Sequence, residues 1–219
     1  RQQMLELVRP EVVLNALPEP LDDPGDELPP LDRQREAYLM FTSGSGGAPR
    51  AIPIWHSHLD HYLEALPRAL GLVPEDRALH TASFSFSSSV RQLLAPLVSG
   101  ASEPLPVRLA QAWIQRAPQL QLWNLYGQTE TCGIVCVHPV DGQEQGTFVP
   151  LGTPLPGWEV LLFDAQGLPV PTGHEGELCW GGPSLSPGPL GQEPLPGWND
   201  QGRCYYRSGD RGRWGRDGR

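Results

Sequence analysis

The sequence predicts an α/β part over residues 35–139, followed by a β-rich part over residues 140–219. In the first part, apolar runs with the length of buried strands alternate with stretches of helical spacing. In the second, short apolar runs are separated by Gly and Pro, a pattern typical of a small β-barrel or sandwich. With 219 residues the chain can hold one or two domains with a real core.

Composition excludes several classes of function. The formal net charge of −9 and the sequence pI near 5.1 leave no basic field for a nucleic acid, so we expect no such partner. All 16 basic residues are arginines, so a mechanism that needs a lysine cannot be completed within this chain. Neither an apolar run long enough to span a membrane nor a signal-peptide core is present, which predicts a soluble, cytoplasmic protein.

The four cysteines have no paired spacing, so the sequence indicates neither a zinc site nor a disulfide framework. We expect all four to be buried, reduced thiols. The spacing HxHxxH of His56, His58 and His61 permits metal ligation in principle, but helical phase places His58 and His61 only loosely on one face.

Residues 1–34 are predicted to hold a remnant strand at Glu11–Leu17 and an acidic, proline-rich linker at Pro18–Pro30. Glu36–Phe41 has the content of a buried strand, and a loop of small residues follows it at once. Ser57 is expected to cap a helix whose apolar positions repeat at helical spacing, and Pro67 to end or kink it.

The remaining elements of the α/β part are two strands, two helices and a turn. They are expected at Ala78–Phe86 (strand), Val90–Leu97 (helix, closed by Gly100), Leu109–Arg116 (helix), Leu120–Leu125 (strand) and Tyr126–Thr131 (turn). The β-rich part is expected to contain strands at Trp158–Phe163, Gly176–Trp180 and Cys204–Arg207, with a turn at Asp164–Gly167.

Three short motifs carry candidate chemistry. Thr42–Arg50 (TSGSGGAPR) offers hydroxyl and backbone N–H donors without side-chain bulk, as a polyphosphate requires, although it is neither a Walker A loop nor GxGxxG, and a plain flexible turn explains it as well. In Asn124–Thr131 (NLYGQTET), Tyr126 can stack on a purine, and Thr129 with Glu130 can meet a phosphate and its Mg²⁺. Asp210 can accept hydrogen bonds from the two hydroxyls of a ribose. Taken singly, the last two are equally well explained as ordinary turns.

The combination and order of motifs resembles the adenylate-forming superfamily, most closely the adenylation domains of nonribosomal peptide synthetases. Five segments carry the resemblance, from about residue 36 onward: Thr42–Arg50, Phe86–Ala101, Asn124–Thr131, Gly176–Gly188 and Tyr206–Gly218. The resemblance implies a partial adenylate-forming core, a mixed sheet with helices, followed by a small barrel-like subdomain.

The resemblance also implies an activity. In that family a carboxylate attacks the α-phosphorus of ATP, and the acyl group of the resulting acyl-adenylate passes to the phosphopantetheine thiol of a carrier protein or to CoA. By position it implies phosphate contacts for Thr42, Ser43, Gly44, Ser45, Gly46 and Gly47; nucleotide contacts for Asn124, Tyr126, Gly127 and Asp210; catalytic contacts for Thr129 and Glu130, with Glu130 on Mg²⁺; and substrate contacts for Phe86 and Ser87.

The sequence departs from the family at several of these positions. Gly46 and Arg50 stand where threonine and lysine are usual, which predicts weakened phosphate binding. Ser87 stands where amino-acid-activating members carry an aspartate for the substrate's ammonium group, which favours a fatty, aryl or hydroxy acid as substrate.

Lengths depart as well. The stretch near residues 98–106 runs straight on where the family has a much longer segment, so we expect an internal deletion there. The chain ends before the family's carboxyl-terminal cap, which we therefore expect to be absent. Two alternatives stay open: a fragment of an acyl-CoA or fatty-acyl ligase, and a non-catalytic nucleotide-binding or interaction remnant.

Overall fold

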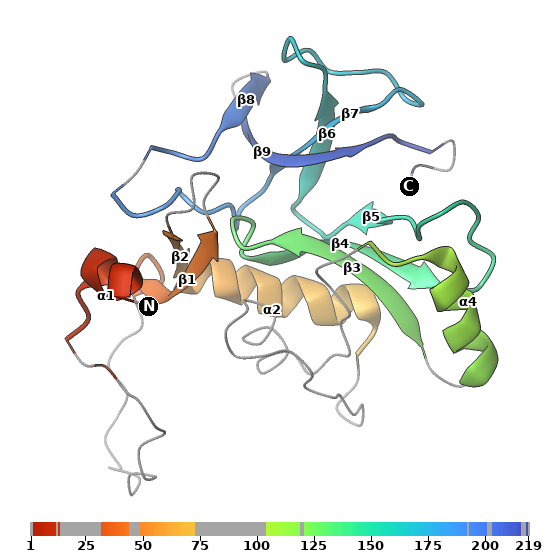
Figure 1. The fold of residues 1–219 in the computed structure, drawn as a ribbon, viewed down its shortest axis with the longest axis horizontal. Helices are drawn as coiled ribbons and strands as arrows, with labels where there is room; N and C mark the ends of the chain where they lie inside the picture. Colours follow the sequence, from red (N-terminus) through yellow and green to blue (C-terminus); the bar gives the residue numbers. More distant parts are fainter. Residues whose placement is uncertain are drawn as a thin grey trace, which may run out of the picture.

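Three antiparallel sheets and three helices make up the described part of the chain (Figure 1). The structure is a computed structural model, and it describes residues 2–11, 13, 32–43, 49–72, 104–118, 121–191, 193–200, 203–215 and 218. The expected strand at Ala78–Phe86, helix at Val90–Leu97 and linker at Pro18–Pro30 lie outside these residues. Most of the expected deletion near residues 98–106, namely residues 98–103, also lies outside them, as does most of the strand expected at Glu11–Leu17. A short helix, α1 (Gln2–Val8), was not predicted.

The first sheet is a hairpin of β1 (Glu36–Ser43) and β2 (Pro49–Trp55). The strand predicted from Glu36 is confirmed, and it runs two residues further than expected. β2 was missed because Pro49 and Pro53 argue against a strand interior. Prolines are tolerated here because both strands of a two-stranded sheet are edges, and residues 51–54 of β2 are nevertheless fully buried.

Helix α2 (His56–Leu70) confirms the amphipathic helix that the spacing predicted. Its N-cap is Trp55 rather than Ser57, and Pro67 lies inside the helix, which continues to Leu70. Gly71 then ends it in the left-handed conformation, at φ 64°, where glycine has no steric penalty. Its buried face includes Tyr62 and Leu66.

The second sheet has the order β3–β4–β5 and is accompanied by helix α4, which confirms the helix predicted at Leu109–Arg116. The bounds are β3 (Leu122–Gln128), β4 (Gly133–Val140), β5 (Thr153–Pro154) and α4 (Val107–Arg116). β3 continues three residues past its predicted end, so the turn expected from Tyr126 begins only at Thr129.

β4 was missed because a strand buried on both faces lacks the alternation that marks half-buried strands. Since β5 pairs with β4, this sheet extends past residue 140, where the second part was expected to begin; that boundary stays a prediction.

The third sheet has the order β6–β7–β9–β8. Its strands are β6 (Glu159–Phe163), β7 (Gly176–Gly181), β8 (Gly197–Asp200) and β9 (Arg203–Gly212). The three strands predicted here are confirmed, and the four-residue β8 was missed. The expectation of a barrel is wrong for the described residues, because β6 and β8 stand at the two ends of the strand order and do not pair with each other; at its outer edge β6 forms an isolated bridge between Phe163 and Pro169. β9 reaches Gly212, so Asp210 lies within a strand rather than beyond one.

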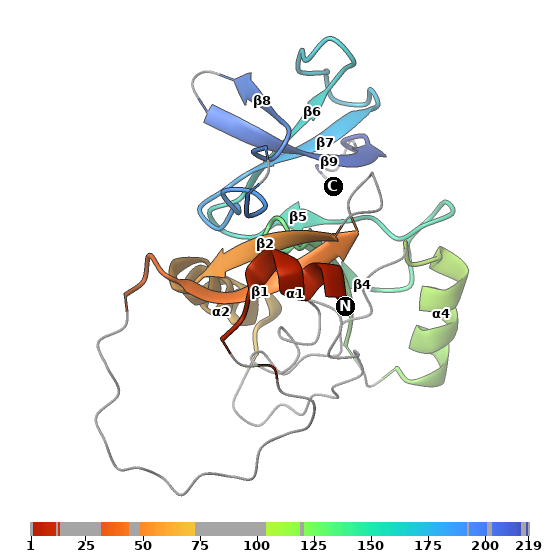
Figure 2. The same cartoon turned by 60° about the vertical axis from the view of Figure 1, so that its left-hand side comes forward.

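One apolar cluster joins these elements. It packs α2 against β3 and β4 of the second sheet and continues into the third sheet. Its members include Leu66 from α2, Val135 from β4 and Trp180 from β7, each at most 1% exposed. Both views show the third sheet standing above the second, with α2 beneath (Figures 1 and 2). Within the described ranges, no helix has the length and apolarity needed to cross a bilayer.

Candidate nucleotide-binding site

Two residues that the sequence assigned to different motifs are in direct contact. The hydroxyl of Tyr126 on β3 donates a hydrogen bond to Oδ2 of Asp210 on β9 at 2.6 Å, although the residues are 84 positions apart. One face of the Tyr126 ring stacks against Trp180, with centroids 5.5 Å apart. Burial, reinforced by the hydrogen bond to Asp210, raises the pKa of Tyr126 well above its usual range. The hydroxyl therefore stays protonated, and remains a donor, even above pH 10, where an ordinary tyrosine loses its proton.

Gln128 joins this contact, and sequence reasoning missed it. Its Nε2 donates to Oδ2 of Asp210 at 3.2 Å and to the carbonyl oxygen of Ser208 at 3.0 Å. The available signal was its position two residues after Tyr126, which puts both side chains on one side of an extended strand. The prediction of a turn from Tyr126 onward concealed that relation.

Gly127 packs closely against β4. The register shifts between Tyr126 and Gly127, and a Cβ added to Gly127 would lie 1.8 Å from the carbonyl oxygen of Gly133. Only glycine fits this position without moving the backbone. The packing of β3 against β4 therefore explains why position 127 is a glycine, independently of any ligand.

Thr129 and Glu130 lie in the tight turn that joins β3 to β4. The backbone N–H of Cys132 donates to the carbonyl oxygen of Thr129 at 3.0 Å. Thr131, which sequence reasoning did not single out, accepts the N–H of Gln128 at 3.0 Å, and its hydroxyl lies 2.9 Å from the carbonyl oxygen of Gly133. The side chain of Thr131, a residue of the turn, thus holds the turn closed.

The loop that follows β7 fastens this turn to the first sheet. Ser186 donates its backbone N–H to the carbonyl oxygen of Glu130 at 2.8 Å, and its hydroxyl donates to the carbonyl oxygen of Pro53 at 3.4 Å. Leu190 donates to the carbonyl oxygen of Ala51 at 2.9 Å. As a result, Glu130, a residue only 8% exposed, is linked through Ser186 to the β1–β2 hairpin.

The hairpin carries the ends of the candidate phosphate loop. Thr42 and Arg50 are directly opposite each other in the β1–β2 register, on either side of residues 44–48. The Thr42 hydroxyl oxygen is buried and has no hydrogen-bond partner among the described residues. An unpaired buried hydroxyl costs free energy, so this atom is suited to accept or donate to a ligand. Gly44, Ser45, Gly46, Gly47, Phe86, Ser87 and the side chain of Ser43 lie outside what the structure describes.

Charged side chains from several motifs affect the pKa of Tyr206, which is buried. Burial raises its pKa above the usual range; the carboxylates of Glu130 and Asp210 raise it further, and the guanidinium of Arg50 lowers it. Charged residues from three of the predicted motifs, Arg50, Glu130 and Asp210, are therefore near enough to Tyr206 to shift its pKa. Among the described residues there is no group of three or more side chains that could hold a metal ion. Mg²⁺ is usually bound through one or two carboxylates together with phosphates and water, so a single carboxylate such as that of Glu130 is compatible with it.

Asn124 has a structural partner. Its amide Nδ2 donates to the carbonyl oxygens of Pro150 at 2.8 Å and Val149 at 3.4 Å, and the residue is only 7% exposed. The side chain thereby ties the loop before β5 to β3. A direct nucleotide contact for Asn124 stays a prediction.

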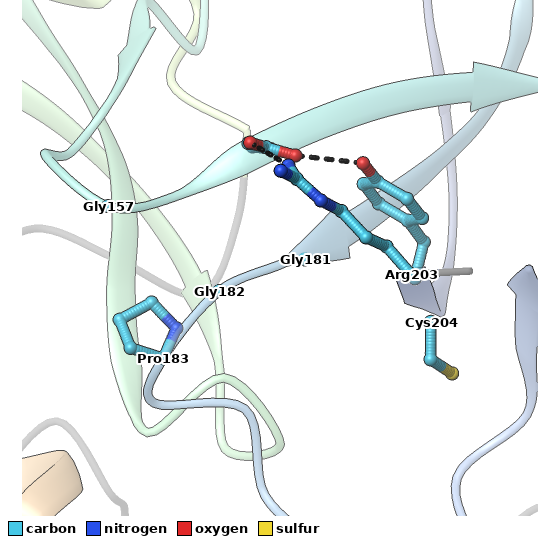
Figure 3. Close-up of a pocket in the computed structure, with 8 residues that line it drawn as sticks. Gly157, Gly181, Gly182, Pro183, Arg203 and Cys204 are labelled. Atoms are coloured by element: carbon cyan, nitrogen blue, oxygen red, sulfur yellow. Dashed lines mark hydrogen bonds and ion pairs between the residues drawn. The ribbon is translucent and has the colours of Figure 1, made fainter. Parts of the chain in front are cut away.

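A cavity of about 340 Å³ opens elsewhere on the third sheet (Figure 3). It contains the ion pair of Glu159 with Arg203, and Glu159 also accepts a hydrogen bond from the Tyr205 hydroxyl at 2.8 Å. These charges satisfy one another, and none of the predicted site residues lines the cavity. Cys204 on its wall is exposed, so the expectation of four buried thiols is wrong for this residue and right for the other three.

Comparison with known proteins gives consistent matches. Residues 3–103 and 101–189 match the family of AMP-binding enzymes. The hybrid PKS-NRPS synthetase TAS1 of Botryobasidium botryosum is 29% identical over 259 aligned positions, which cover 89% of this chain and 15% of that protein. The non-ribosomal peptide synthetase CmlP of Streptomyces venezuelae is 40% identical over 97 residues, 44% of this chain and 10% of the synthetase. The chain thus spans a small part of these relatives.

Solved structures share the fold. The adenylation domain AlmE of Vibrio cholerae, in complex with glycyl-adenosine-5′-phosphate, superposes with a TM-score of 0.74 at 23% identity, over 84% of this chain and 47% of that one. Identity at this level shows the fold alone. The described sheets and helices therefore form part of an adenylation-domain fold.

Proposed function

Because the chain belongs to the AMP-binding enzyme family, we propose that it binds ATP and activates a carboxylic acid as an acyl-adenylate. The observation that carries the proposal is the contact of Tyr126 with Asp210, which joins the predicted adenine and ribose residues in one place. The second and third sheets, formed by separate parts of the sequence, meet at this contact. A nucleotide, whose adenine and ribose would be bound by residues of different sheets, requires such a meeting point.

Each residue has a part in the proposed binding. Trp180 occupies one face of the Tyr126 ring, so adenine would stack on the opposite face. The ribose hydroxyls would donate to Asp210, and the phosphates would meet the donors of Thr42–Gly47. Glu130, with Thr129 beside it, would hold Mg²⁺ against the phosphates, where the ion would supply neutralisation of the charge on the phosphate chain. Because pyrophosphate is a good leaving group, positioning and charge neutralisation supply most of the catalysis.

The acyl acceptor is proposed to be the phosphopantetheine thiol of a carrier protein, with CoA as the alternative. The similarity to peptide synthetases supports the carrier protein. Ser87 in place of an acidic residue supports an acid without a free α-amino group. An amino acid remains the competing substrate class, since AlmE was crystallised with a glycyl adenylate.

One observation favours a second function, nucleotide binding without turnover. The family matches this chain as two blocks that meet at residues 101–103, and the 259-position alignment is longer than the 219-residue chain. Relatives therefore have residues in the matched span that this chain lacks. This supports the proposed deletion near residues 98–106, where the family carries much of its acyl pocket.

Calorimetry with ATP and Mg²⁺, followed by pyrophosphate exchange with amino, aryl and fatty acids, separates these functions. Asp210→Asn should weaken ATP binding about tenfold or more, because a hydrogen bond to a charged group contributes about 1.5–3 kcal/mol. Asp200→Asn on the edge strand β8 is the control and should bind ATP as the wild type does. Exchange with one acid class supports the ligase, and binding without exchange supports the second function. Absence of any ATP binding would refute both.

A further inference from the structure

The geometry assigns Gln128 a role that the motif comparison does not: it is a positioning residue that orients the Asp210 carboxylate for the ribose. This inference rests on the proposed nucleotide binding. Among the hydrogen bonds between described side chains, both donors to Asp210, Tyr126 and Gln128, use the same oxygen, Oδ2. With Oδ2 occupied by these two donors, Oδ1 is the oxygen left to accept from a ribose hydroxyl.

The orientation of the Gln128 amide follows from its partners. Its nitrogen faces two acceptors, Oδ2 of Asp210 and the carbonyl oxygen of Ser208. If the amide were reversed, its oxygen would face both acceptors and both hydrogen bonds would be lost. The remaining amide oxygen is buried and finds no partner within the described part of the chain. The amide nitrogen of Gln128 thus donates both of its hydrogen bonds to β9, the strand that carries Asp210.

The backbone around Asp210 is held by other contacts. The Ser208 hydroxyl donates to the carbonyl oxygen of Leu178 at 2.8 Å and accepts the N–H of Asp210 at 3.0 Å. Glu177 accepts the N–H of Gly209 at 3.3 Å. Without Gln128 these contacts keep β9 in place, whereas the exposed carboxylate of Asp210 loses one of its two tethers and can rotate. The expected consequence is poorer ribose recognition in a folded protein.

The test compares binding of ATP and of 2′,3′-dideoxyATP, which lacks both ribose hydroxyls, by isothermal titration calorimetry, which requires no turnover. Gln128→Met removes the amide and keeps an unbranched side chain of similar length. Gln145→Met, at an exposed position, is the matched control. Wild type and control should prefer ATP over 2′,3′-dideoxyATP. In Gln128→Met this preference should fall about five- to tenfold, with little change in the affinity for 2′,3′-dideoxyATP.

Gln128→Glu supplies a second measurement, and it is also used if the methionine variant does not fold. A carboxylate beside Asp210 repels it and offers no donor, so ribose preference should fall at least as far. Thermal melting of every variant shows that the protein compared is folded.

Each outcome is decisive. Loss of ribose preference with retained binding of 2′,3′-dideoxyATP supports the positioning role. An equal loss for both nucleotides shows a general structural role and overturns it, as does an unchanged preference. If the wild type binds neither nucleotide, the proposed function itself fails. If the wild type binds both equally, nucleotide binding stands and only the assignment of Asp210 and Gln128 to the ribose falls.

Discussion

Replacing Gly127 by alanine tests the packing on which the candidate site depends. The added methyl carbon would lie 1.8 Å from the carbonyl oxygen of Gly133 and 2.7 Å from the Cα of Ile134. Both neighbours are backbone atoms, so no side chain can rotate away. Ordinary contact begins near 3.4 Å, and the two strands must therefore separate by about 1.5 Å at this point.

The magnitude follows from what that separation breaks. Overpacking of this kind costs about 1–3 kcal/mol. The pairings of Gly127 with Ile134 and of Gln128 with Gly133 lie at the displaced position, and each backbone hydrogen bond lost there costs about 1 kcal/mol. We expect Gly127→Ala to lower the free energy of unfolding by about 2–4 kcal/mol.

Urea denaturation measures the effect, and Gly212→Ala is the matched control. Gly212 is also a strand glycine, but the nearest atom to its added Cβ is a Leu178 side-chain carbon at 3.5 Å. Since alanine restricts the unfolded chain, this control should be neutral or more stable by up to about 1 kcal/mol. For a chain of this length the Gly127 variant should melt about 5–15 °C lower.

Equal stability of the two variants would refute the close approach of β3 and β4. A destabilised Gly127→Ala that still binds ATP with unchanged ribose preference would show instead that the strand position at Gly127 does not control Asp210. The two results separate the packing of this position from its proposed contribution to the site.

Three further outcomes are expected. Glu144→Gln should lower the free energy of unfolding by about 1–3 kcal/mol, because its buried carboxylate accepts hydrogen bonds from two backbone N–H groups and a histidine N–H. The control Glu175→Gln, at an exposed position, should change it by less than about 0.5 kcal/mol in the same urea titration. Above the ordinary tyrosine pKa near 10, the folded state keeps the proton of Tyr206 while the unfolded state loses it, so the free energy of unfolding falls as pH rises. Tyr206→Phe should reduce the slope of this fall by about 1.4 kcal/mol per pH unit. An unchanged slope would contradict the burial of the Tyr206 hydroxyl. A thiol reagent should label one cysteine of the native protein, and Cys204→Ser should abolish the labelling; reaction of the buried thiols at the same rate would be inconsistent with this fold.

Elements with strong local signals were predicted well. The spacing of α2 and the apolar runs of β1, β6 and β7 depend on neighbours in the sequence, and their bounds came within a few residues. β2 and β4 were missed, because prolines and burial on both faces remove the local signal of a strand. The barrel was wrong because closure depends on which edge strands meet, and local patterns do not specify that.

The candidate site divides in the same way. Tyr126, Glu130 and Asp210 were singled out from their chemistry and from the order of the motifs. Gln128 was not, because its importance depends on a strand 80 residues away whose register no local pattern encodes. Asn124 was assigned to the nucleotide on resemblance, and the structure shows its amide donating to backbone carbonyls.

By itself the sequence determined the family, the set of candidate ligand-binding residues and the Thr42–Arg50 loop as the candidate phosphate site, because motif composition and order are properties of the chain alone. Only the tertiary structure decided that the carboxylate of Asp210 is shared by Tyr126 and Gln128, and that Ser186 links Glu130 to the hairpin carrying Thr42 and Arg50. Those relations arise when the third sheet packs on the second through a common apolar core. Burial of that core fixes distances between side chains that the sequence leaves free.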